Sequence, residues 1–142
     1  MTEPSVVVVD ASVAVKWIIL ETGRESALDL LRRVVSGEVI MIAPRALLEE
    51  VASALSKRVR RKQLTATQAR AAFRYFDWRR PRLVEDPQLL VEALDLSLRH
   101  HLSLWDSLYV ALAVRLRCNL VTADERLHRG VSRHYPFVEL LR

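Results

Sequence analysis

Apolar residues along the chain form two kinds of pattern, short continuous runs and longer stretches in which they recur every three or four positions. The runs predict strands buried on both faces, and the longer stretches predict amphipathic helices. The predicted strands are residues 5–9, 39–43, 119–122 and 137–140, with a short edge strand after a turn in 79–84. The predicted helices are residues 11–20, 22–36, 44–62, 65–77, 86–101, 103–118 and 125–130. This alternation indicates an α/β fold with a mainly parallel sheet and right-handed crossovers.

Local signals refine these helices. Residues 22–25 (Thr-Gly-Arg-Glu) have the spacing of a capping box, and Pro44 suits the first turn of a helix. The helix over residues 103–118 is apolar on every side between residues 108 and 114, which predicts deep burial. In the helix over 86–101, the residues expected to face the core are Leu90, Ala93, Leu94 and Leu98.

The size and composition fit one domain spanning residues 1–142. Of the 142 residues, 51% are hydrophobic, and no Gly-, Pro- or Ser-rich linker divides the chain. No apolar run approaches the roughly 20 residues that span a bilayer, and the N-terminus lacks a basic signal-peptide region. A single cysteine, Cys118, excludes an internal disulfide and a cysteine zinc cluster. We therefore expect a soluble cytoplasmic protein with no membrane partner.

The charge is basic, with a net value of +5 carried mainly by arginine. A basic balance favours a polyanionic partner such as nucleic acid, and arginine suits bidentate phosphate contacts. Solubility alone, or genome composition, also accounts for such a balance, so charge does not decide the function.

Four acids lie where an α/β crevice could collect them. Asp10 and Asp124 follow the two clearest buried strands, and ligands of open α/β sheets bind at the carboxyl ends of strands. Asp106 lies in the first turn of the apolar helix. On the helical wheel of residues 44–62, Glu50 falls at the margin of the apolar face, whereas Glu49 falls nearly opposite and is expected to be solvated.

Gathered carboxylates point to metal chemistry. Partly desolvated carboxylates repel one another unless a cation neutralises them. Ligands that are all oxygen suit Mg²⁺ or Mn²⁺ rather than zinc, and such a site can activate water and stabilise charge on a phosphate. The set therefore predicts hydrolysis of phosphodiester bonds.

Each acid also has a purely structural interpretation. Asp10, Asp106 and Asp124 all lie at the predicted start of a helix, where a carboxylate caps the chain or favours the helix dipole. Glu50 could pair with a basic residue of its own helix. Taken one at a time these roles are common, but they do not explain why two of the acids end the central strands.

Four segments together resemble the successive motifs of PIN-domain ribonucleases, in particular the VapC-like toxins of bacterial and archaeal toxin–antitoxin modules. They are Val-Val-Asp-Ala-Ser (8–12), Ala-Pro-Arg-Ala-Leu-Leu-Glu-Glu-Val (43–51), Leu-Trp-Asp-Ser-Leu-Tyr-Val-Ala-Leu-Ala (104–113) and Leu-Val-Thr-Ala-Asp (120–124). Each motif is weak by itself, but the ordered set is specific and covers essentially the whole chain.

The resemblance implies a three-layer α/β/α sandwich and a Mg²⁺- or Mn²⁺-dependent endoribonuclease that leaves a 5′-phosphate and a 3′-hydroxyl. It also implies a cognate antitoxin and a homodimer. The implied catalytic and metal-binding residues are Asp10, Glu50, Asp106 and Asp124, with Ser12 and Thr122 as supporting hydroxyls. We expect the three aspartates to carry most metal coordination, with Glu50 binding a second ion or positioning water.

Other side chains suggest how RNA is held. Trp105 stands where the family often has tyrosine before the third acid, and both Trp105 and Trp17 could stack a base, although core packing is the commoner fate. Three basic clusters could flank the acids or form solvated helix ends: 58–62, 79–82 and the arginines at 126, 129 and 133.

Other function classes remain as alternatives. A PIN nuclease of RNA processing and a non-catalytic RNA-binding module are both compatible with parts of the pattern. A haloacid-dehalogenase-like phosphatase requires a second aspartate where Ser12 stands. A receiver domain requires a late lysine, and no lysine follows Lys62.

Overall fold

The structure is a computed structural model that describes residues 3–142. Its strands are β1 (Ser5–Val9), β2 (Val39–Pro44), β3 (Arg82–Val84), β4 (Asn119–Thr122) and β5 (Val138–Leu140). Its helices are α1 (Ala11–Ile18), α2 (Arg24–Val35), α3 (Leu47–Arg60), α4 (Ala66–Arg79), α5 (Pro87–His100), α6 (Leu104–Leu116) and α7 (Glu125–Val131). The sequence pattern predicted each of these elements, with boundaries that differ by a few residues.

The five strands form one sheet in the order β3-β2-β1-β4-β5, and every pair of neighbours is parallel. The chain leaves β1 toward β2 on one side, and leaves β4 toward β5 on the other. The carboxyl ends of β1 and β4 therefore form the topological switch point of the sheet, where α/β folds bind their ligands. Val9 is paired with Val121 at that edge, so the residues that follow both strands are brought together.

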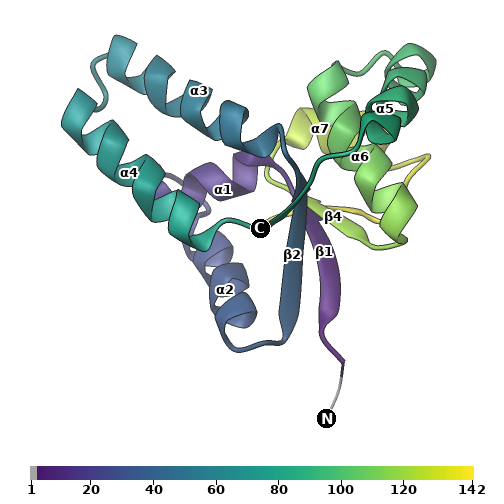
Figure 1. The fold of residues 1–142 in the computed structure, drawn as a ribbon, viewed down its shortest axis with the longest axis horizontal. Coiled ribbons are helices and arrows are strands. Elements are labelled where there is room, and N and C mark those ends of the chain that lie inside the picture. Colours follow the sequence, from purple (N-terminus) through teal and green to yellow (C-terminus); the bar gives the residue numbers. More distant parts are fainter. Residues whose placement is uncertain (1–2) are drawn as a thin grey trace.

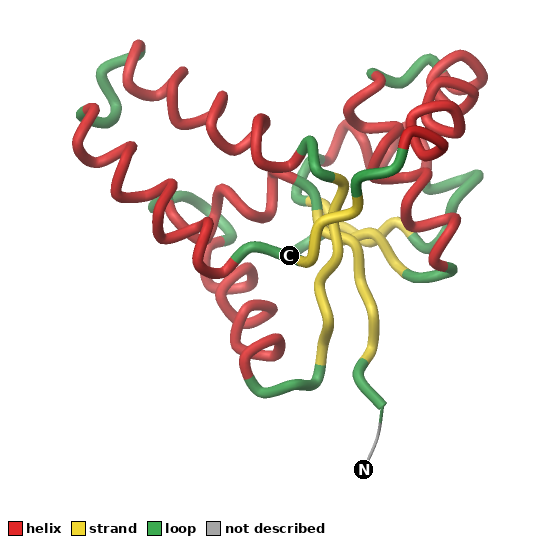
Figure 2. Tube along the Cα trace, viewed as in Figure 1, coloured by secondary structure: helices red, strands yellow, loops and turns green. Residues whose placement is uncertain are grey.

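Helices cover both faces of the sheet. Figure 1 shows α1 to α4 on one side of the sheet and α5 to α7 on the other, which confirms the three-layer α/β/α arrangement. Figure 2 shows the strands as the narrow layer between the two sets of helices. The core includes Val8 and Val9 at the end of β1, Met41 and Ala43 of β2, and the middle of α6, where residues 107–113 are all buried. No helix within residues 3–142 combines the length and apolar character needed to cross a bilayer.

Two predicted helix starts were wrong. Pro44 ends β2, paired with Val84 of β3, because a strand end tolerates a residue without an N–H group. The helix begins three residues later, at Leu47. No capping box forms at Thr22: α2 begins after Gly23, which has a left-handed φ of 87° and makes no side-chain capping bond.

The predicted inward face of α5 was also wrong. Ala93 is buried, but the side chains of Leu90, Leu94 and Leu98 are at least half exposed. The helix presents a neighbouring stripe to the core instead, formed by Leu89, Ala93 and Leu96. The exposed residues, together with Val91, leave an apolar strip on the outer side of α5.

Candidate active site

Asp10 ends β1 and caps α1. The residue is only 5% exposed, and its carboxylate accepts a hydrogen bond from the backbone N–H of Val13 at 3.3 Å. Two hydroxyl groups donate to the same carboxylate, Ser12 Oγ to Oδ1 and Thr122 Oγ1 to Oδ2. The capping role and a role in a site are therefore compatible in one residue.

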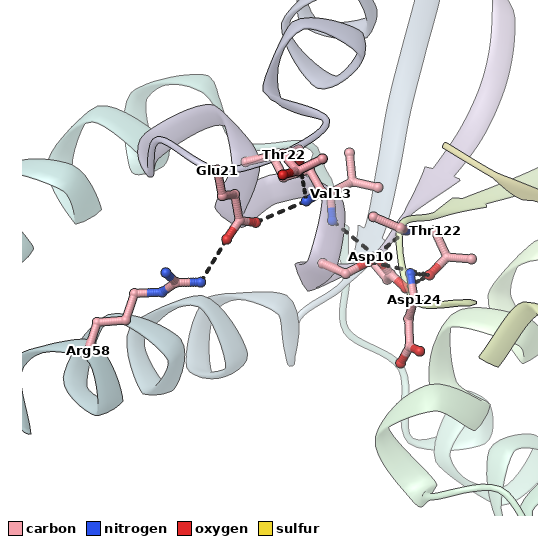
Figure 3. Close-up of polar contacts among 10 residues, drawn as sticks. Asp10, Val13, Glu21, Thr22, Arg58, Thr122 and Asp124 are labelled. Carbon is pink, nitrogen blue, oxygen red and sulfur yellow. Dashed lines mark hydrogen bonds and ion pairs between the residues drawn. The ribbon is translucent and has the colours of Figure 1, made fainter. Parts of the chain in front are cut away.

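The hydroxyls of Ser12 and Thr122 tie the ends of β1 and β4 together. Ser12 Oγ accepts the backbone N–H of Ala123 at 2.8 Å, and Thr122 Oγ1 accepts that of Asp124 at 3.1 Å. Figure 3 shows Asp10, Thr122 and Asp124 meeting at this point. The network fixes the Asp10 carboxylate and places the start of the Asp124 loop beside it, as groups that orient a ligating carboxylate do.

Asp124 and Asp106 lie at helix starts, as the sequence predicted. Asp124 caps α7, accepting from the backbone N–H groups of Arg126 at 2.9 Å and Leu127 at 3.2 Å. Asp106 lies in the first turn of α6, where its backbone N–H donates to Ser103 Oγ at 3.1 Å. The carboxylates of both residues lie in half-buried positions, where helix N-termini favour negative charge.

Glu50 lies in the first turn of α3 and faces the core margin, whereas its neighbour Glu49 is exposed and pairs with Arg45. Glu50 Oε1 accepts a hydrogen bond of 2.7 Å from the hydroxyl of Tyr109, a side chain that is 1% exposed in the middle of α6. Sequence reasoning missed Tyr109, because its place in an apolar helix indicated packing only. The one signal available was a buried phenol, whose hydroxyl needs a partner.

Electrostatics link the four acids. Burial is the largest cause of a raised pKa at three of them, and brings the pKa of Asp10 to about 6 and that of Glu50 to about 7. Like charge adds to burial: Asp106 raises the pKa of Asp10, and both Asp10 and Asp106 raise that of Glu50. Asp124 in turn raises the pKa of Asp106. Like-charge repulsion from other acids of the set therefore acts on Asp10, Glu50 and Asp106.

The side chains do not form a finished metal cage. Within residues 3–142, no three Asp, Glu, His or Cys side chains converge closely enough to hold a metal ion as they stand. Carboxylates that face one crevice repel one another, and a cation bound among them would offset that repulsion. A set of four carboxylates without imidazole or thiolate nonetheless has the donor chemistry of Mg²⁺ or Mn²⁺.

A groove of about 640 Å³ opens beside the acids, between α1 and α3. Its near end is formed by Ser12, Glu50 and Trp105, and its far end by Lys16, Lys57 and Arg58. Trp105 is 52% exposed there. The other tryptophan considered from the sequence, Trp17, is buried in the core, and its indole N–H donates to the carbonyl oxygen of Ala27 at 2.9 Å.

Comparison with known proteins agrees with this geometry. Residues 7–131 match the family model of the PIN domain. The chain is similar to ribonuclease VapC9 of Mycobacterium tuberculosis, at 35% identity over 121 residues that cover 85% of this chain and 87% of the relative.

Two solved structures share the fold. The toxin VapC20 of Mycobacterium tuberculosis, described as cleaving the sarcin–ricin loop, has a TM-score of 0.70 at 18% identity, covering 96% of this chain and 99% of that one. The VapBC2 complex of Rickettsia felis, bound to a DNA fragment from its promoter, has a TM-score of 0.66 at 14% identity, covering 89% and 93%.

The fold, the acids at the switch point and these matches define the class: the chain belongs to the PIN domain family. Within that family it is a VapC-type ribonuclease, the toxin class of toxin–antitoxin systems.

Proposed function

We propose that this chain hydrolyses RNA phosphodiester bonds as a Mg²⁺- or Mn²⁺-dependent endoribonuclease, using Asp10, Glu50, Asp106 and Asp124. The observation that carries the proposal is the switch point of the parallel sheet, where Asp10 and Asp124 follow neighbouring strands and share a repulsive field with the other two acids. Raised pKa values clustered at one crevice are typical of functional sites.

The residues divide the work according to their positions. Asp10, Asp106 and Asp124 would hold the metal ion, which when bound lowers the pKa of a water molecule and stabilises charge on the phosphate. The hydroxyls of Ser12 and Thr122 keep the Asp10 carboxylate in one orientation. Tyr109 fixes Oε1 of Glu50, so Oε2 is left to orient the attacking water or a second ion.

We further propose that a cognate antitoxin protein silences the enzyme by covering the acidic crevice. The support is the shared fold with the VapBC2 complex together with the VapC-type family. Because the proposed substrate is RNA, we place the enzyme in the cytoplasm. Co-expression with the protein encoded by the adjacent gene is expected to yield a complex in which RNA cleavage is lost.

We also propose a homodimer, in which the apolar strip of α5 is covered by a second copy. Leu90, Val91, Leu94 and Leu98 are all at least half exposed and follow one side of the helix. A contiguous apolar strip on a soluble chain is more often an interface than a free surface.

The chemistry of the cut ends tests the proposed reaction. Metal-dependent hydrolysis by water is expected to leave a 5′-phosphate and a 3′-hydroxyl, and adaptor ligation before and after phosphatase treatment detects both. Products that carry a 2′,3′-cyclic phosphate would show attack by the ribose hydroxyl instead, and would overturn the mechanism.

A further inference from the structure

The groove beside the acids has a regular construction on α3. Glu50, Ser53, Ala54, Lys57 and Arg58 line it at the spacing i, i+3, i+4, i+7 and i+8 that marks one face of a helix, and Glu49 adds a second carboxylate at the acidic end. Seven residues separate Glu50 from Lys57, a rise of about 10 Å along the helix. One side of the groove therefore runs from an acidic end to a basic end, with small side chains between them.

The basic end is held in place by a single carboxylate. Glu21 Oε1 pairs with Lys16 Nζ at 3.1 Å, and Glu21 Oε2 pairs with Arg58 Nη2 at 2.8 Å. Figure 3 shows Arg58 reaching from α3 to Glu21. Lys57 is exposed, and no ion pair of Lys57 occurs within residues 3–142. Two of the three cations pair with the one carboxylate, and Lys57 adds a further positive charge, so this end of the groove keeps a net positive charge.

The acidic end carries an indole. Trp105 directly precedes Asp106 and lines the groove with half its surface exposed, next to Ser12 and Glu50. An exposed indole gives every base a face on which to stack. The volume of about 640 Å³ lies in the range of pockets that enclose a small organic ligand.

We propose that this groove binds single-stranded RNA beside the scissile phosphate, with one base stacked on Trp105 and a neighbouring phosphate bound by Lys57 and Arg58. Glu21 is a positioning residue, because it holds Arg58 and Lys16 at the groove wall. The opposite charges of the two ends give the strand a direction: the bond to be cut lies at the acids, and a phosphate further along lies at the cations. The inference rests on the proposed ribonuclease function, and it specifies which residues bind the RNA substrate.

The test measures binding separately from cleavage. In an Asp10→Asn background, fluorescence anisotropy with a short, 5′-fluorescein-labelled oligouridylate gives the Kd and its dependence on salt. Trp105→Ala is expected to weaken binding roughly tenfold and to leave the salt slope unchanged, with Trp105→Phe restoring most of the affinity. Lys57→Ala is expected to weaken binding and to reduce the salt slope by about 0.7, the value for one lost phosphate contact on a single strand.

Matched control variants come from α4, none of whose residues lines this groove. Trp78→Ala removes an indole that is 87% exposed, and Arg74→Ala removes one exposed positive charge. Both are expected to keep the Kd and salt slope of the Asp10→Asn parent. If Trp105→Ala and Lys57→Ala behave like these controls, RNA binds elsewhere and the inference is overturned.

Two further measurements separate this inference from the proposed function. Cleavage of RNA by the wild type with Mg²⁺, combined with unchanged binding by the groove variants, removes the groove assignment and leaves the ribonuclease intact. If the wild type does not cleave RNA and the Asp10→Asn parent does not bind it, both the groove assignment and the ribonuclease function are overturned. If an oligoglutamate peptide binds the parent more tightly than RNA does, and Lys57→Ala abolishes that binding, the groove belongs to an acidic protein segment instead.

Discussion

At the scale of single residues, the carboxylates of the site repel one another, and a bound cation would relieve that repulsion. The Asp10 carboxylate is buried, and it is kept in place only by hydrogen bonds from hydroxyl groups and a backbone N–H. Burial outweighs these bonds and raises its pKa. The same geometry that prepares the carboxylate for a metal ion therefore costs stability when no metal is bound.

This cost predicts that the stability of the metal-free protein depends on pH. The pKa values of Asp10 and Glu50 rise on folding from 3.8 and 4.5 to about 6 and about 7, so the folded chain keeps protons that the unfolded chain has released. Stability contributed by these groups is then present below about pH 4 and is lost as the pH rises to about 7. Asp10→Asn is expected to stabilise the metal-free protein at neutral pH, by up to roughly 3 kcal/mol.

Urea denaturation in EDTA, at about pH 4.5 and about pH 7, checks this prediction. The difference in unfolding free energy between Asp10→Asn and the wild type is expected to grow in favour of the variant as the pH rises. A difference that stays constant, or that shifts toward the wild type, would show that Asp10 is not under repulsive strain.

Tyr109 carries a second prediction at this scale. Tyr109→Phe removes the hydroxyl that donates to Glu50, and that bond lowers the pKa of Glu50. The variant is therefore expected to need a higher pH for half-maximal cleavage and to bind Mn²⁺ roughly tenfold more weakly, as loss of an orienting partner does. Electron paramagnetic resonance of free Mn²⁺ gives the affinity directly.

The control for this variant is Tyr75→Phe, which removes a phenol hydroxyl from the exposed side of α4. It is expected to match the wild type in Mn²⁺ affinity and in pH profile. If Tyr109→Phe also matches the wild type in both, the hydrogen bond to Glu50 has no part in positioning the carboxylate.

At the scale of elements, sequence periodicity predicted where helices lie better than which way they face. The wheel separated Glu50 from Glu49 correctly, because α3 has one apolar face. On α5 two apolar stripes lie side by side, and the pattern could not tell which one would be buried when α5 packs against α6. The predicted helix start at Pro44 was wrong for a related reason. Pairing with β3, and not local helix propensity, decided where β2 ends.

The exposed stripe on α5 predicts that oligomeric state depends on this helix. Leu94→Asp is expected to convert the dimer to a monomer without unfolding it, because Leu94 is already 51% exposed in the single chain. Analytical ultracentrifugation measures the mass, with circular dichroism as the check on folding. Leu20→Asp, after α1 at a position that is 85% exposed, is the control and is expected to remain dimeric. A wild type that sediments as a monomer would remove the proposed dimer.

At the scale of the whole molecule, the order of the strands explains why distant acids meet. Asp10 and Asp124 are far apart in sequence, yet β1 and β4 are neighbours at the point where the chain reverses its direction across the sheet. The sequence predicted the parallel α/β class and the acids at strand ends. It could not predict the groove, because that depends on how α1 packs against α3, nor the Tyr109–Glu50 bond, which joins helices from opposite faces of the sheet.

The most direct test of the central claim is cleavage of RNA by the purified protein, with Mg²⁺ or Mn²⁺ and with EDTA. Asp10→Asn is compared with Asp29→Asn, which removes a carboxylate from an exposed ion pair on α2. We predict that the wild type and Asp29→Asn cut in metal and stop in EDTA, and that Asp10→Asn loses at least about a hundredfold in rate. Equal cutting by Asp10→Asn, or cutting that persists in EDTA, would contradict a metal-dependent site built on these four acids.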